Sequence, residues 1–337
     1  MPAPKHFVVA ALALALAPAA HAAEVNLYTT REPGLIRPLL EAFTQSSGVT
    51  VNTIFLKDGL LERVAAEGAS SPADLLMTVD IGNLVDLADR GLTQPVASPA
   101  LAAAIPANLR AADGSWHALS LRARTVYADK DLGLTTFTYE QLADPKWKGK
   151  VCIRSGQHPY NVSLIAAYIA HHGEAAAETW LKGVKANLAR RAGGGDRDVA
   201  RDIMGGICEI GVGNSYYVGL MRSGKGGPEQ QKWADAIRMI LPTFESGGTQ
   251  VNVSGAAVAR HAPNREAAVK LLEYLVSPAA QAIYAQANYE YPVVAGAGVD
   301  PLIAEYGALK PDGLDLVAVA RQRKAASELA ERVGFDD

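Results

Sequence analysis

The stretch VNLYTTREPGLIRPLLEAFTQSSGVTVNTIF, residues 25–55, decides the fold. A short apolar run at 25–29 is followed by apolar residues at helical spacing over 35–43 and by a second strand-like run at 49–55. Strand, helix and strand in this order are typical of a parallel sheet that is covered by helices. The region therefore predicts an α/β fold.

The same alternation continues along the rest of the chain. Further strands are expected at 74–77, 116–127, 151–154, 208–212 and 251–260, and helices near 60–66, 84–89, 162–171, 175–184, 265–276 and 279–287. No repeat or Pro/Ser-rich linker divides the sequence, and its 337 residues are enough for two compact lobes. The glycine-rich segment 192–198 has no lysine at phosphate-loop spacing and is expected to be a flexible turn.

The first residues predict export. Lys5 precedes the apolar run FVVAALALALAPAA, and Ala20-His21-Ala22 has the small residues of a cleavage site. A membrane-spanning helix would need about 20 apolar residues, and this run is shorter. We expect residues 1–22 to be a cleaved signal peptide and the mature protein to be periplasmic.

Charge and cysteine content support this compartment. The formal net charge is -3, and Lys and Arg are scattered rather than gathered in an arm or stripe, so no nucleic-acid partner is expected. The two cysteines, Cys152 and Cys208, lack the C-x-x-C spacing of a redox or metal pair. An even pair in an oxidising compartment favours a disulfide.

Six motifs carry a resemblance to a known family. They are ADLLMTVDIGNLVDLADRGLTQPV (73–96), LSLRARTVYADKDL (119–132), DPKWKGKVCIRSGQHPYN (144–161), CEIGVGNSYYVGLM (208–221), VNVSGAAVARHAPN (251–264) and NYEYPV (288–293). In this order they resemble the periplasmic ferric-ion-binding proteins of bacterial ABC iron importers. The resemblance implies a carrier of ferric iron, Fe(III), that is a monomer and delivers its cargo to an inner-membrane ABC permease.

The resemblance also implies the two-lobe type II periplasmic binding protein fold, with a hinged cleft between α/β lobes. The crossover strands would be Leu121–Tyr127 and Val251–Ala259. The first lobe would then comprise 23–121 plus 255–296, and the second lobe 122–254 plus 297–337.

Three tyrosines are the candidate metal ligands. A ferric ion is small and hard and prefers anionic oxygen, which a phenolate supplies once the metal has displaced a proton whose pKa is normally about 10. Tyr216 and Tyr217 are consecutive, so both can reach one ion only from a loop or a helix start, and Asn214-Ser215 before them suits a helix start. A Tyr-Tyr pair alone is usually packing. The family motifs, however, carry metal ligation onto Tyr160, Tyr216 and Tyr217.

The first lobe departs from the family pattern. Relatives often have a histidine, or a histidine and a tyrosine, where Glu32 and Pro33 stand, and some have a glutamate in place of Val79. These departures favour the three-tyrosine subtype, in which a synergistic anion such as carbonate or bicarbonate completes the shell. Water or Glu32 as a further ligand stays open.

Arginines are the candidate anion contacts, because a guanidinium matches a planar oxyanion. Arg31 and Arg122 are the main candidates and Arg124 is a weaker one, while the plain alternative for all of them is a salt bridge. The backbone near Gly156 could also donate to the anion. His158 is close in sequence to Tyr160, so it is a candidate to position that tyrosine without binding the metal itself.

Two other functions remain as alternatives. A protein of the same fold could bind a polyamine, thiamine, or an organic or phosphonate anion instead. A secreted hydrolase is disfavoured because the chain lacks a G-x-S-x-G nucleophile elbow, so no enzyme activity is expected.

Overall fold

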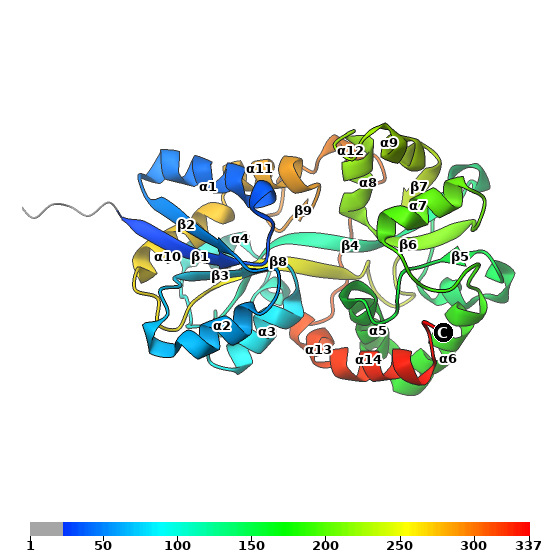
Figure 1. The fold of residues 1–337 in the computed structure, drawn as a ribbon, viewed down its shortest axis with the longest axis horizontal. Helices are drawn as coiled ribbons and strands as arrows, with labels where there is room; N and C mark the ends of the chain where they lie inside the picture. Colours follow the sequence, from blue (N-terminus) through cyan, green and yellow to red (C-terminus); the bar gives the residue numbers. More distant parts are fainter. Residues whose placement is uncertain (1–22) are drawn as a thin grey trace, which may run out of the picture.

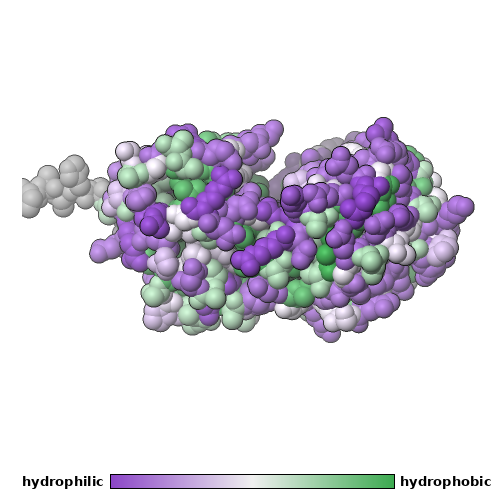
Figure 2. Space-filling view, turned by 90° about the horizontal axis from the view of Figure 1, so that it is seen from below, coloured by the Kyte–Doolittle hydropathy of each residue, from purple (hydrophilic) through white to green (hydrophobic). Residues whose placement is uncertain are grey.

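The computed structural model describes residues 23–337, so the signal peptide expected over 1–22 lies outside the described residues. The ribbon has two halves joined by long strands (Figure 1), which we call the first lobe (left) and the second lobe (right). In the space-filling view the surface is mostly hydrophilic and a notch separates the two halves (Figure 2). No helix in the described part is long and apolar enough to cross a membrane.

The first lobe is built on the strand–helix–strand unit that the sequence predicts. Strand β1 (Glu24–Thr29) pairs in parallel with β2 (Thr50–Phe55) and β3 (Leu75–Thr78), and α1 (Pro33–Ser47) connects the first two. Helices α1 and α11 lie above this sheet in Figure 1, whereas α2 and α3 lie below it. The bounds of the other helices here are α2 Leu60–Glu67, α3 Ile81–Asp89, α4 Pro99–Ala104, α10 Arg265–Leu275 and α11 Pro278–Asn288.

The second lobe has a smaller sheet. Strand β6 (Ile210–Asn214) pairs in parallel with β5 (Val151–Cys152) and antiparallel with the end of β4 (His117–Asp129), which also pairs with β7 (Ile237–Ile240). Its helices are α5 Pro159–His172, α6 Glu174–Ala186, α7 Asp196–Met204, α8 Ser215–Arg222 and α9 Pro228–Asp235. The α/β class is therefore confirmed in both halves.

Strand β4 runs through both halves (Figure 1). Its residues 117–123 pair with β8 (Val251–Val258), and its residues 124–129 pair with β6 and β7. Short strand β9 (Tyr291–Pro292) adds to the first-lobe part of β4. The segments expected to cross between the lobes are thus continuous strands, while the exact lobe boundaries stay a prediction.

Helix α12 (Pro301–Ala304) lies beside α8 at the upper edge of the molecule in Figure 1. The last two helices, α13 (Leu316–Arg321) and α14 (Arg323–Arg332), lie at the lower edge. At the start of α14, Arg323 reaches across to α3 of the first lobe, with Nη2 lying 3.0 Å from both carboxylate oxygens of Asp86. The end of the chain therefore binds the two lobes together away from the strands.

The predicted disulfide is confirmed. Cys152 ends β5 and Cys208 lies just ahead of the neighbouring strand β6, which brings their Cα atoms to 5.9 Å. This separation suits a disulfide without movement of the backbone. The bond ties together the two strands that lead toward Tyr160 and toward the Tyr216–Tyr217 pair.

Candidate functional site

A cleft of about 460 Å³ lies between the lobes and is lined by both. The first lobe contributes the segment Thr30–Glu32, Val79, and the end of α11 with the two residues that follow it. The second lobe contributes Tyr160, Tyr216 and Tyr217, so the cleft brings together all the tyrosines that the sequence singles out. Arg31, Glu32, Val79 and Arg122 from the sequence analysis also line it, whereas Arg124 does not.

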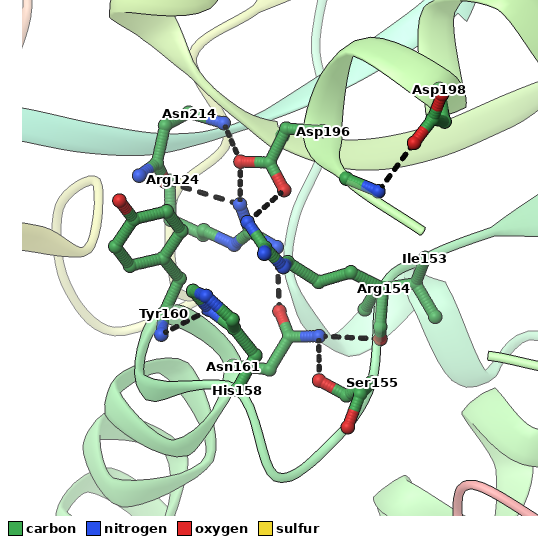
Figure 3. Close-up of polar contacts among 12 residues, drawn as sticks. Arg124, Ile153, Arg154, Ser155, His158, Tyr160, Asn161, Asp196, Asp198 and Asn214 are labelled. Carbon is green, nitrogen blue, oxygen red and sulfur yellow. Dashed lines mark hydrogen bonds and ion pairs between the residues drawn. The ribbon is translucent and has the colours of Figure 1, made fainter. Parts of the chain in front are cut away.

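Tyr160 stands in the first turn of α5. Pro159 occupies the first helical position, where its missing N–H costs nothing, and the Nδ1 atom of His158 accepts a hydrogen bond from the Tyr160 amide at 3.2 Å. Burial, followed by the positive charge of Arg154, lowers the pKa of His158 to about 4, so its ring is neutral and can accept this bond. His158 thus fixes the backbone of Tyr160 (Figure 3).

Tyr216 and Tyr217 stand in the first turn of α8, as the sequence predicts. The Oη atoms of Tyr160 and Tyr216 share a hydrogen bond of 3.0 Å, and the rings of Tyr216 and Tyr217 lie with centroids 4.3 Å apart. Helical geometry explains how neighbours in sequence reach one place, because side chains of a first turn fan out over the helix end. The cleft therefore holds a cluster of phenol oxygens.

A buried ionic network lies beside Tyr160 (Figure 3). The guanidinium of Arg124 pairs with Asp196 at 2.7 Å and donates to the side-chain oxygens of Asn161 at 2.6 Å and Asn214 at 3.1 Å. Asn161 follows Tyr160, and Asn214 precedes the first turn of α8. The network therefore locks both tyrosine-bearing helix starts to strand β4.

One expectation is confirmed and one is wrong in this region. Asn214 occupies the cap position of α8, as a helix start there requires, although its side chain accepts from Arg124 and makes no capping hydrogen bond. Residues 192–198 do not form only a flexible turn, since Asp196 begins α7 and is buried beneath the cleft. No local sequence signal could have revealed its partner Arg124, which lies 72 residues away on strand β4.

Desolvation keeps Tyr216 and Tyr217 protonated. Burial, reinforced by the neighbouring Tyr160, raises the pKa of Tyr217 to about 12 and that of Tyr216 well above its ordinary value. Positive charges stand around the rings, with the guanidinium carbons of Arg122 and Arg154 at 5.7 and 5.1 Å from the ring centroid of Tyr160. These cations favour phenolates once a metal ion has displaced the protons.

The two candidate anion contacts have different surroundings. Arg31 is buried and already paired, with Nη2 lying 2.8 Å from Glu290 and 3.0 Å from the Oη atom of Tyr284. Arg122 is equally buried, but its hydrogen bond from Nη2 to the carbonyl of Val253, at 3.3 Å, is the one that its guanidinium makes within the described residues, while the Nε atoms of both arginines have no partner there. Arg122 is thus the less satisfied guanidinium on the cleft.

Other predicted contacts are engaged elsewhere or exposed. The Gly156 amide donates to Asp336 at 2.6 Å, so the expectation that it faces an anion is wrong. Glu32 is exposed at the start of α1, where its side chain makes no capping hydrogen bond. Within residues 23–337 no group of three or more His, Cys, Asp or Glu side chains is placed to hold a metal ion, which leaves the tyrosines as the clustered donors.

Comparison with known proteins matches this arrangement to a family. The profile of bacterial extracellular solute-binding proteins matches residues 70–316. The chain belongs to this family. As a member of the bacterial extracellular solute-binding proteins it is a binding protein and not an enzyme, which confirms that expectation.

Proteins similar to this solute-binding protein are named for iron uptake or ferric iron binding. It is 40% identical over 315 residues to the iron uptake protein A1 of Synechocystis sp., covering 93% of this chain and 87% of the relative. Among solved structures it is similar to a Bordetella ferric binding protein, at 65% identity and a TM-score of 0.91, with 93% and 100% of the two chains covered. The resemblance and the two-lobe fold are thereby confirmed.

A Trichodesmium protein solved in complex with iron and citrate ligands is a further match. It is 42% identical, has a TM-score of 0.88, and is matched over 93% of this chain and 99% of its own.

Proposed function

We propose that this protein captures ferric iron in the interlobe cleft and delivers it to an inner-membrane ABC permease. One observation carries the proposal: the phenol oxygens of Tyr160 and Tyr216 lie 3.0 Å apart, and Tyr217 lies beside them. All three side chains line the cleft from the N-terminal ends of two helices. Two phenol oxygens at this distance can bind one cation. The relatives named above, a ferric binding protein and an iron uptake protein, support the same cargo.

Tyr160, Tyr216 and Tyr217 act as phenolate ligands in this proposal. Three phenolates neutralise the charge of Fe(III), and hard anionic oxygen is what such an ion prefers. The surrounding network of Arg124 and Asp196 holds the two helix starts in place before iron arrives. The protein works in the periplasm as a monomer after removal of its signal peptide.

A synergistic anion completes the coordination shell. Arg122 and Arg31 line the same cleft, each with an Nε that has no partner among the described residues, and supply positive charge for an oxyanion. Carbonate or bicarbonate is small enough to share the cleft with iron. Citrate is the second candidate, favoured by the Trichodesmium relative with its iron and citrate ligands and by the exposed Arg197 at the cleft.

Iron titration tests the proposal. Protein purified without chelator is titrated with ferric iron, once in carbonate-free buffer with citrate and once with bicarbonate, while visible absorbance and bound metal are measured. We expect one equivalent per chain and a tyrosinate-to-iron charge-transfer band. A protein that stays colourless and binds no iron under either condition would overturn the proposal, and the dependence on each added anion identifies the anion.

The other ligands of the fold fit less well. A polyamine is a cation and would need several acidic residues free to bind it. Of the two that line the cleft, Glu290 is paired with Arg31 and Glu32 is exposed. Two further arginines, Arg122 and Arg197, line the same cleft. An iron-free protein that binds spermidine or thiamine would reverse this choice.

A further inference from the structure

Tyr289 stands in an unusual backbone conformation at the edge of the cleft. It follows the last residue of α11 with φ of 57°, and no other residue besides glycine has a positive φ in the described part of the chain. The left-handed region is unfavourable for a residue that carries a Cβ atom. Tyr289 is nevertheless buried, so contacts with neighbouring residues must stabilise this backbone conformation.

The residues on both sides of Tyr289 are tied to the first lobe. Asn288 donates to the carbonyl of Leu35 in α1 at 3.3 Å, and Glu290 forms the buried ion pair with Arg31 at 2.8 Å. The backbone of Tyr289 is therefore fixed between two anchors. Only its side chain is free to point away from its own lobe.

The ring of Tyr289 packs against the second lobe. A Cβ atom added to Gly219 of α8 would lie 2.6 Å from both Cβ and Cγ of Tyr289, closer than real contacts allow. The amine of Lys225, just beyond α8, lies 4.8 Å from the centroid of the same ring. Tyr289 thus contacts the very helix whose first turn carries Tyr216 and Tyr217.

Two locally unfavourable choices meet at this contact. Glycine in the middle of a short helix weakens it relative to alanine, and a left-handed tyrosine strains the end of α11. Natural sequences break local rules chiefly where function requires it. Ordinary packing would have been satisfied by an alanine on α8 and a glycine after α11.

We propose that Tyr289 is a positioning residue that sets the spacing between the first lobe and helix α8, and thereby the enclosure of the metal site. The proposal rests on the proposed iron function. The ring acts as a stop against the bare backbone of Gly219, two residues beyond Tyr217. Because the three tyrosines all belong to the second lobe, the stop governs how tightly the first lobe covers them rather than their own arrangement.

Gly219→Ala is the decisive variant, because the two explanations predict opposite outcomes. If only helix stability matters, alanine strengthens α8 and leaves iron retention unchanged. If Tyr289 is a stop, the added methyl pushes the lobes apart, and iron is released to excess chelator about tenfold faster while the charge-transfer band per bound iron stays at the same wavelength. Gly34→Ala is the matched control, since nothing lies within 4 Å of a Cβ at that helical glycine.

A double-mutant cycle then identifies the partner. Tyr289→Gly accepts the positive φ but removes the ring that fixes the spacing between the first lobe and α8, so release should also be about tenfold faster. In the double variant the added methyl has no ring to push against, so its release rate should equal that of Tyr289→Gly alone. Tyr289→Phe keeps the ring and should behave as wild type. Release rates that multiply in the double variant, or an unchanged release rate in Gly219→Ala, would overturn the inference.

Small-angle scattering separates this inference from the iron proposal. Gly219→Ala should enlarge the radius of gyration of the iron-free protein, and Tyr289→Gly in the same chain should restore it. A wild type that binds no iron refutes the iron proposal alone, because the scattering result still stands. An unchanged radius in a well-folded Gly219→Ala protein counts against the stop.

Discussion

The two walls of the cleft are built on different principles. The second-lobe wall presents Tyr160, Tyr216 and Tyr217 from two helix starts that Arg124 and Asp196 lock together. The first-lobe wall presents Arg31, already paired with Glu290, and the exposed Glu32. The second-lobe wall is a set of preorganised oxygen donors, whereas the first-lobe wall contributes charged side chains and covers the tyrosines.

This difference suggests a division of labour. A site whose ligands come from one rigid lobe can hold an ion before the cleft closes, because no ligand has to be brought across the gap. The other wall then controls access of water and the loss of the ion. The predictions below test this division, from the largest expected effect on iron retention to the smallest.

The largest expected effect is that of pH. In the iron-free protein the pKa of Tyr217 is about 12 and that of Tyr216 is higher still, so both are protonated at neutral pH. Each phenolate–iron bond releases a proton, so the association constant falls as the pH falls, by up to about 1,000-fold per pH unit for three tyrosines. Competition with a chelator of known protonation, measured between about pH 8 and pH 6, gives the slope.

An affinity that is flat or that rises on acidification would show that the tyrosines are not phenolate ligands.

Removal of one phenol oxygen should have the next largest effect. Phenylalanine at 160, 216 or 217 keeps the ring and deletes the donor, so we expect the colour to weaken and the affinity to fall by about 100-fold or more, since even residues that only support a ligand typically cost 10- to 100-fold. The pH slope should drop by about one proton in each variant. Absorbance titrations of the three variants provide both values.

Tyr274→Phe is the control for this series. Tyr274 belongs to α10 of the first lobe and packs against Phe43, with centroids 5.3 Å apart, outside the cleft. If Tyr216→Phe or Tyr217→Phe matches this control in colour and slope, the ligand-bearing wall has been assigned to the wrong residues.

The two cleft arginines should separate anion binding from stability. Arg122 has no carboxylate partner within ion-pair distance in the described residues, so Arg122→Gln should weaken iron binding roughly 30-fold and blunt its response to bicarbonate, as expected for loss of a charge-assisted hydrogen bond. Arg31→Gln leaves Glu290 buried without its partner, so it should lower the free energy of unfolding by about 3–5 kcal/mol.

Thermal or denaturant unfolding of both variants, beside bicarbonate-dependent iron titrations, checks this pair. If Arg31→Gln abolishes the bicarbonate response while Arg122→Gln preserves it, the first-lobe wall holds the anion and the assignment is reversed.

The fold and the candidate tyrosine ligands could both be predicted from the sequence, but from different kinds of signal. The period of apolar residues predicts the strand–helix alternation, and β1 and β2 pair in parallel as it requires. The helix start before Tyr216 follows from local signals at Asn214 and Ser215. The disulfide is predicted from the oxidising compartment and the even number of cysteines, and the bond between Cys152 and Cys208 confirms it.

The supporting contacts could not be predicted because they join distant parts of the chain. Arg31 and Glu290 are 259 residues apart, and Arg124 meets Asp196 from 72 residues away. No local pattern marks such partners, since a buried charge is recognisable only once the strand that carries it is placed. The strained Tyr289 gave no local signal either, as its conformation depends on anchors to Leu35 and Arg31.

The smallest expected effect is that of Glu32→Gln, and it tests the comparison most strictly. Glu32 lines the cleft from the first lobe but is exposed, and its side chain does not cap α1. A solvent-exposed charge contributes only about 0.2–1 kcal/mol to a neighbouring charge, so neutralising it should change the iron affinity by less than about fivefold. Gln keeps the shape of the side chain, and Arg37→Gln on the outer side of α1 controls for a change of net charge near the same helix. A loss of tenfold or more with Glu32→Gln alone would make Glu32 a metal ligand. The first-lobe wall would then supply a donor across the gap, and the contrast between a binding wall and a covering wall would fail.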